Sequence, residues 1–109
     1  MKPTRFFSKN QEKQVAKNLS GKVIPNSGAT AFAKGDVALD DFLIECKTKT
    51  SPCTSFSIKK EWITKQRMET LSMRKSNWAI AFQYEPKGEN FYVIDEKTFK
   101  MFLDLLNKQ

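Results

Sequence analysis

The 109-residue sequence contains no histidine and only two cysteines, Cys46 and Cys53. Without histidine the chain cannot use a Ser-His or Cys-His nucleophile, or a histidine general base. Two sulfur ligands alone do not build a zinc site, which needs four nitrogen or sulfur ligands, or three plus water. We therefore expect Cys46 to be a small buried residue and Cys53 to be a loop thiol.

Long apolar runs are also absent. The longest is the five residues Trp78–Phe82, whereas a membrane-spanning helix needs about 20, and the N-terminal MKPTRFF lacks the apolar core of a signal peptide. With 4 glycines, 4 prolines and 39% hydrophobic residues, the composition is typical of a folded domain. We expect one domain over residues 1–109, located in the cytoplasm and with no membrane partner.

Acidic residues are scarce, 12 against 19 basic ones, and they are unevenly distributed. Residues 1–34 carry seven Lys or Arg and one acid, residues 47–75 carry eight and two, and residues 35–46 carry four acids and no base. An acidic segment between basic ones suggests a metal-binding centre inside a phosphate-attracting surface. The alternative is that a pI near 9.5 only keeps the protein soluble.

The hydrophobic pattern predicts elements in the order αβββαββα, which is an α/β domain with a mixed sheet flanked by helices. Ser8 and Gln11 have the spacing of a capping box, so a first helix is expected over about residues 9–19, with Gly21 as its stop. Strands are expected over about 22–25, 37–46 (a hairpin), 77–84 and 91–94, and helices over about 58–75 and after a capping Asp95.

The predicted hairpin over residues 37–46 has Asp40 and Asp41 as its two turn residues. In that register the numbers of paired residues sum to 81, which sets Asp36 opposite Glu45. Directly opposed side chains have Cβ atoms about 4.5 to 5.5 Å apart, close enough for two carboxylates to share a cation. A longer turn would move the two acids out of alignment, and Asp-Asp lacks the glycine that two-residue turns favour.

Lys47 lies two residues beyond Glu45 and therefore projects from the same face of the strand. Oxygen ligands without histidine favour Mg²⁺ or Mn²⁺, and such an ion can activate water for attack on a phosphodiester. Lys47 would then hold the attacking water or contact the phosphate. The alternative is an ordinary hairpin in which Lys47 only pairs with a carboxylate. The opposite, apolar face is expected in the core: Val37, Leu39, Phe42, Ile44 and Cys46.

Gly35-Asp36 followed by Ile44-Glu45-Cys46-Lys47 resembles the signature of the PD-(D/E)xK nucleases. Within that superfamily the chain is most similar to the small Holliday junction resolvases of archaea and of Gram-positive bacteria and their phages. Their first-helix glutamate and Ser-Gly turn match Glu12 and Ser27-Gly28, and the Thr-Ser-Phe segment of the bacterial type matches residues 54–56.

Three positions depart from these patterns. Lys13 and Asn26 stand where the archaeal group typically has arginine, and Gly35 replaces the proline of the signature.

The resemblance implies a Mg²⁺- or Mn²⁺-dependent endonuclease that makes paired nicks in four-way DNA junctions during recombination and repair. It also implies a homodimer, because nicks on opposite strands require two sites related by a two-fold axis, and no nucleotide cofactor. The implied roles are metal ligation by Asp36, Glu45 and the Cys46 carbonyl, water activation or orientation by Lys47, an accessory acid at Glu12, and a phosphate or water contact at Ser27. For Ser27 the alternative is a turn serine that closes its own backbone.

Two other functions stay open: a nicking or restriction-type nuclease on duplex or branched DNA, and a basic nucleic-acid-binding module without catalysis. Trp62 and Trp78 are expected in the core rather than stacked on bases. The apolar stripe of the last helix is expected in the core or, in part, along a dimer seam: Phe99, Phe102, Leu103 and Leu106. Candidate contacts to the DNA backbone are Lys13, Lys34, Lys49, Lys59, Lys60, Lys65 and Arg67.

Overall fold

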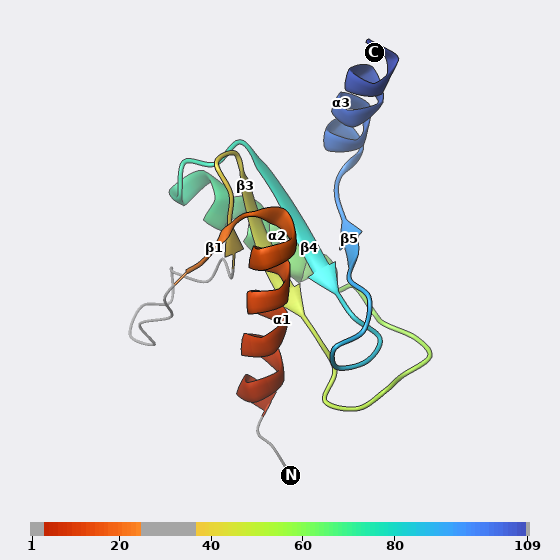
Figure 1. Cartoon of the computed structure of the whole chain (residues 1–109). Coiled ribbons are helices and arrows are strands. Elements are labelled where there is room, and N and C mark those ends of the chain that lie inside the picture. The colour runs from red at the N-terminus through yellow and green to blue at the C-terminus, as the bar shows by residue number, and fades with distance from the viewer. Residues whose placement is uncertain (1–3, 25–36, 109) are drawn as a thin grey trace.

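The computed structural model describes residues 4–24 and 37–108 (Figure 1). The helices are α1 (Thr4–Leu19), α2 (Lys60–Ser72) and α3 (Glu96–Asn107). The strands are β1 (Lys22–Val23), β2 (Val37–Ala38), β3 (Phe42–Lys47), β4 (Asn77–Phe82) and β5 (Phe91–Val93). The predicted α/β class and the order αβββαββα are confirmed. None of the three described helices is long and apolar enough to cross a membrane.

The strands form one mixed sheet in the order β1-β2-β3-β4-β5. β3 and β4 are parallel at its centre, and all other neighbours are antiparallel. Parallel neighbours need a crossover connection, which α2 supplies between these two strands. Because the central strands are covered on both faces, β4 is a continuous apolar run after its first residue, NWAIAF.

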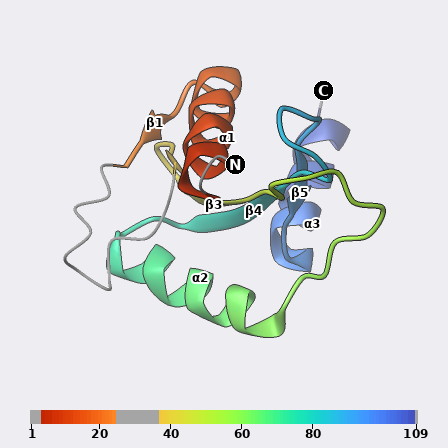
Figure 2. The same cartoon turned by 90° about the horizontal axis from the view of Figure 1, so that it is seen from below.

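α1 and α2 cover opposite faces of the sheet (Figure 2). Side chains alternate along β3, so Ile44 and Cys46 face α1, whereas Leu43, Glu45 and Lys47 face α2. The buried cluster on the α1 side confirms the predicted core face of the hairpin; its members are Val15, Ala16, Val37, Ile44, Cys46, Ala79 and Ala81, with Leu39 and Phe42 packed against them.

The boundaries of α1 differ from the prediction. The helix already begins at Thr4, so Ser8 lies inside it and the predicted capping box is wrong. After the helix Ser20 adopts a left-handed backbone conformation with φ of 58°. Gly21 follows because space is short where the chain enters β1: a Cβ atom there would lie 3.0 Å from the carbonyl oxygen of Ala38.

α3 follows β5 and extends away from the sheet (Figure 1). Asp95 caps the helix as predicted, since its side chain accepts a backbone hydrogen bond from the first turn. The ring of Phe102 stacks on Phe42 with centroids 6.1 Å apart. The predicted core stripe is wrong, however, because Phe99 is 54% exposed and Leu106 is 65% exposed. α3 is amphipathic but has little of the sheet to pack against.

Neither Cys46 nor Cys53 forms a disulfide bond. Cys46 is buried in the α1-side core and Cys53 lies half-buried in the loop between β3 and α2, as predicted. The backbone N–H and the thiol of Cys53 both donate to the carbonyl oxygen of Tyr84, at 2.9 and 3.2 Å. The thiol therefore helps to fasten this loop to the chain that follows β4.

Candidate metal and nucleic-acid site

Glu45 is positioned by the β2–β3 hairpin. The described pairs of the hairpin are Val37 with Ile44 and Ala38 with Leu43. Their numbers sum to 81, and the N–H of Leu39 donates to the carbonyl of Phe42 at 2.9 Å across a two-residue turn. The predicted register is therefore confirmed for these pairs. Asp36, which the same register would place opposite Glu45, lies outside the described residues.

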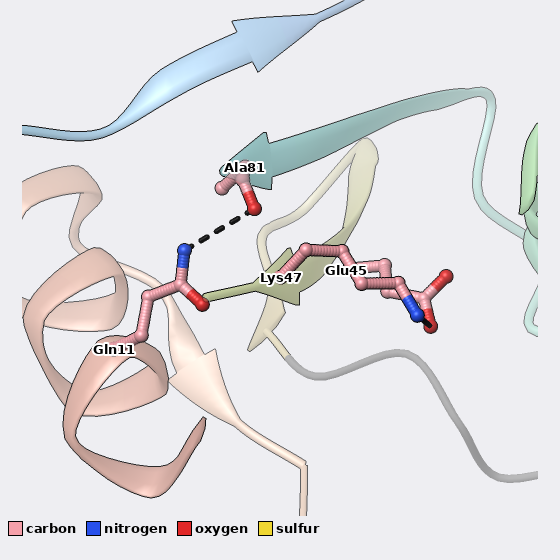
Figure 3. Close-up of polar contacts among 4 residues, drawn as sticks. All are labelled: Gln11, Glu45, Lys47 and Ala81. Carbon is pink, nitrogen blue, oxygen red and sulfur yellow. Dashed lines mark hydrogen bonds and ion pairs between the residues drawn. The ribbon is translucent and has the colours of Figure 1, made fainter. Parts of the chain in front are cut away.

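Glu45 and Lys47 project from the α2 face of β3, as their spacing predicts. The Nζ atom of Lys47 lies 3.5 Å from Oε1 of Glu45 (Figure 3). The Glu45 side chain is 11% exposed and that of Lys47 is 29% exposed. Charges in such a partly desolvated position interact more strongly than they would in bulk water. The pair can therefore act on a phosphate or a cation that approaches from the α2 side.

Lys47 also contacts the first turn of α2. Its Nζ atom lies 4.4 Å from the centroid of the Trp62 ring, and Nζ of Lys59 lies 5.9 Å from the same ring. The prediction of Trp62 as a core residue is thus only partly right, because the ring is half-buried. Trp78, in contrast, is buried at 5% exposure as predicted. Lys59 is the N-cap residue of α2, and its carbonyl accepts a hydrogen bond from the N–H of Trp62 at 3.0 Å, which holds the two residues together at the start of the helix.

The Cys46 thiol cannot belong to this site, because it packs in the core on the α1 side. The backbone carbonyl of Cys46 points in a different direction from the thiol. β3 pairs in parallel with β4. On that side of β3, the carbonyl oxygens of Asp41 and Lys47 accept hydrogen bonds from the backbone N–H groups of Asn77 and Gln83. Since carbonyls alternate in direction along a strand, the Cys46 carbonyl is directed to the β2 side of β3. This orientation is compatible with the predicted role of the carbonyl, and only of the carbonyl, as a metal ligand.

The donor chemistry fits a hard divalent ion. The Glu45 carboxylate and the Cys46 carbonyl are oxygen ligands, which suit Mg²⁺ or Mn²⁺. Among residues 4–24 and 37–108 there is no group of three His, Cys, Asp or Glu side chains that could hold an ion by itself. Glu12 is half-buried on α1, which covers the other face of the sheet. A metal site at Glu45 therefore depends on Asp36; like Asp36, Ser27 lies outside the described residues.

Gln11 has a role that the sequence did not reveal. Its side chain is 1% exposed and reaches from α1 to β4, where Nε2 donates to the carbonyl of Ala81 at 3.2 Å (Figure 3) and to Oδ1 of Asn90 at 3.1 Å. Its Oε1 atom is buried without a hydrogen-bond partner among the described residues. Glutamine is usually read as a surface residue in a sequence, so no pattern predicts this contact.

A second glutamine links the end of β3 to α1. Gln83, 1% exposed, donates from Nε2 to Oε1 of Gln14 at 2.8 Å and to the carbonyl of Gly88 at 3.1 Å. Its own Oε1 accepts from the hydroxyl of Thr48 at 2.8 Å. Thr48 follows Lys47 directly, so this network fixes the backbone at the end of the strand that carries the candidate site.

α2 turns polar residues toward the sheet. Gln66, Glu69 and Thr70 are buried, whereas Met68 and Leu71 are 68% and 77% exposed. In the second half of this helix the apolar side chains therefore face solvent and the polar ones face the sheet. Nε2 of Gln66 donates to the carbonyl of Leu43 at 3.0 Å, so the helix is attached to β3 through a polar contact beside the candidate site.

The predicted DNA-backbone residues do not form one surface. Lys13 is exposed on α1, and a second group is exposed on the other side of the sheet, on α2 and the loop before it. Within that group Arg67 is 3.9 Å from Asp95 and stacks over Trp78 at 5.7 Å. Lys34 lies outside the described residues. The members of the second group are Lys49, Lys59, Lys60, Lys65 and Arg67.

Comparisons with protein-family models, with curated proteins and with solved structures find no match to this chain. The resemblance to the PD-(D/E)xK nucleases therefore stays a hypothesis based on a short motif. A proposal about function therefore rests on the fold topology, the hairpin register and the geometry around Glu45.

Proposed function

We propose that the protein is a Mg²⁺-dependent, structure-specific DNA endonuclease of the PD-(D/E)xK type that nicks four-way junctions in pairs. The observation that carries the proposal is the placement of Glu45 and Lys47 on one face of β3, 3.5 Å apart, in a hairpin with the required register. The proposal requires the next pair of that register, Asp36 with Glu45, to form.

Each residue then has a distinct task. Asp36, Glu45 and the Cys46 carbonyl would hold the ion, and the ion would supply activation of the attacking water and stabilisation of charge on the phosphodiester. The Nζ atom of Lys47 lies against the Glu45 carboxylate, from where it can donate hydrogen bonds to a water or to a phosphate oxygen. We therefore assign it the orientation of the attacking water or of a phosphate oxygen. Ser27 stays a phosphate contact in this proposal. Glu12, predicted as an accessory acid, lies on the helix that covers the opposite face of the sheet and is given no contact with the ion.

A homodimer belongs to the same proposal, since paired nicks need two sites. The apolar surface of α3 supports it: apolar side chains exposed by about a third or more on this one helix are Phe99, Met101, Phe102, Leu103, Leu105 and Leu106. Exposed apolar surface of this extent is typical of interaction sites. Leu106→Glu should convert a dimer to a monomer in light scattering, while Lys108→Glu at the polar end of the helix should not; a monomeric wild type would contradict this part.

The alternative of a non-catalytic binding module has one observation in its favour. Lys47 already has two partners, Glu45 and Trp62, so the described geometry is self-consistent without an ion. A restriction-type nuclease would share the site and differ in its substrate.

The test is a nicking assay on a synthetic four-way junction and on linear duplex, each in Mg²⁺ and in EDTA. Wild type is compared with Glu45→Gln and with Glu96→Gln, which removes an exposed carboxylate on α3. Paired nicks at the branch, seen only with metal and lost only in Glu45→Gln, would support the proposal. Equal cleavage of duplex would instead indicate the restriction type, and binding without cleavage in Mg²⁺ and Mn²⁺ would indicate the binding module.

A further inference from the structure

The loop between β3 and α2 and the helix start gather lysines and aromatic rings beside the candidate site. The rings of Phe56 and Trp62 contact each other with centroids 6.2 Å apart. Lys47 and Lys59 lie over Trp62, and Nζ of Lys49 lies 5.0 Å from the centroid of Phe56. We call these five residues the aromatic–lysine cluster.

The cluster is held in place by the sheet. Phe56 packs on Phe82 at the end of β4, with ring centroids 5.0 Å apart. The same loop is fastened at Cys53 by two hydrogen bonds to Tyr84, and at Thr48 by the hydroxyl bond to Gln83. A binding surface that is already ordered loses less conformational entropy when a ligand binds.

The cluster carries positive charge and reachable ring surface. Lys49 and Lys59 are exposed, and Phe56 and Trp62 are half-buried. Glu45 is in ion-pair contact with only one of the three ammonium groups, that of Lys47. Most of the cluster's positive charge is therefore available to an anion from solution.

Unpaired nucleotides combine the two groups that such a cluster recognises, a phosphate for the ammonium groups and a base for the rings. Bases in a duplex are stacked inside and cannot reach a protein ring, whereas unpaired bases stack on aromatic side chains. We propose that the aromatic–lysine cluster binds unpaired nucleotides of DNA next to the phosphate that Glu45 and Lys47 address. The choice of DNA, and of that phosphate, rests on the proposed function.

The lysine–ring contacts do not oppose this binding. An exposed cation–π contact is worth less than the stacking of a base on an aromatic ring. A nucleotide can therefore replace the contact, with its base on the ring and its phosphate on the displaced ammonium group. Lys47 lies between Trp62 and Glu45, so an unpaired nucleotide on the cluster leaves the adjoining phosphate beside the candidate catalytic pair.

The test measures binding of fluorescein-labelled oligo-dT and of a duplex of equal length by anisotropy in EDTA. Trp62→Leu and Phe56→Leu should each weaken oligo-dT binding about tenfold and change duplex binding by less than about twofold, because stacking is specific to unpaired bases. Tyr92→Leu is the matched control. Tyr92 is 40% exposed and lies on the α1 side of the sheet, where it pairs with Ala81.

A second measurement needs no change in the cluster. The chain has two tryptophans, and Trp78→Phe leaves Trp62 as the single tryptophan. Oligo-dT should quench the tryptophan fluorescence of this variant, and duplex should not. If that variant fails to fold, the same comparison is made on the wild type, whose tryptophan fluorescence should be quenched by oligo-dT and not by duplex. Unchanged oligo-dT affinity in both leucine variants, equal losses for both DNA forms, or no quenching would each overturn the inference.

Glu45→Gln separates this inference from the proposed nuclease. The variant should bind oligo-dT in EDTA at least as tightly as the wild type, because it removes a negative charge 3.5 Å from Lys47 of the cluster and leaves both rings in place. If the wild type does not cleave DNA but its oligo-dT binding depends on Trp62, the proposed nuclease function is wrong and the inferred binding by the cluster stands. Cleavage that succeeds while binding is indifferent to Trp62 and Phe56 would do the reverse.

Discussion

α1 and α2 cover the two faces of one sheet and bury different kinds of residue. Among the side chains described on α1, the buried ones are the apolar Val15 and Ala16 and one polar residue, Gln11. α2 buries only polar residues, Gln66, Glu69 and Thr70, and leaves its leucine and a methionine in solvent. Glu45 and Lys47 lie on the α2 side.

Burial of polar groups costs free energy unless each group finds a partner. Oε1 of Gln66 is buried with none among the described residues, and so is Oε1 of Gln11 on α1. The two helices therefore differ in what accompanies their buried polar groups. α1 also contributes buried apolar side chains to the core, whereas the buried residues of α2 are all polar.

The largest expected effect is that of Glu45→Gln on activity. If Glu45 is a metal ligand, as we propose, its loss should lower metal-dependent nicking about a thousandfold, since the ion would supply several kcal/mol of transition-state stabilisation. The free energy of unfolding should change by only about 1 kcal/mol, because the glutamine amide still offers an oxygen to Lys47, whose side chain is 29% exposed to water. Activity and urea denaturation measured on the same preparation check both halves. A large loss of stability would show that the α2 face is a core after all.

The next effect is on stability alone. Ile44 is 2% exposed in the core on the α1 side, so Ile44→Ala creates a cavity there and should lower the free energy of unfolding by about 3 kcal/mol. Its counterpart, Gln66→Leu at 0% exposure on the other side, should cost less than about 1.5 kcal/mol. The lost hydrogen bond to Leu43 is offset by the removal of an oxygen without a described partner. Urea denaturation of both variants checks the difference, and equal costs would remove the contrast between the faces.

The same contrast explains what the sequence could predict. The order of elements, the hairpin register and the apolar face of the hairpin follow from periodicity, because the α1 side obeys the rule that apolar residues are buried. The contact of Glu45 with Lys47 followed from their spacing on a strand. In each of these cases the local pattern and the tertiary environment agree.

The predictions that failed concern elements in which pattern and environment disagree. Nothing local distinguishes the buried Gln11 or Gln66 from surface glutamines, since their partners lie more than 20 residues away in the chain. The stripe that includes Phe99 and Leu106 is correctly amphipathic, but periodicity does not say whether an apolar face meets its own domain or solvent. Asp36 and Ser27 lie outside the described residues and stay predictions.

The smallest expected effect concerns Asp95, which joins the start of α3 to the α2 side through Arg67. Hydrogen bonds from the Thr98 side chain and backbone, followed by the charges of Arg67 and Lys97, outweigh desolvation and lower the pKa of Asp95. A lowered pKa means that the stability it contributes is present above the unfolded-state pKa of about 3.9 and is lost as pH falls through the folded-state value.

Asp95→Ala should therefore cost about 1 kcal/mol at pH 7, the usual worth of a helix cap, and progressively less below about pH 4. Asp95→Asn keeps a capping oxygen without a titrating charge, so it should cost less than the alanine variant at pH 7. The cost of Ile44→Ala should not depend on pH, because no titrating group is removed from the α1-side core. Urea denaturation from pH 3 to 7 compares the three variants. A cost of Asp95→Ala that stayed constant down to pH 3 would mean that the cap acts through geometry alone, and that the charges gathered on the α2 side contribute nothing to holding α3 there.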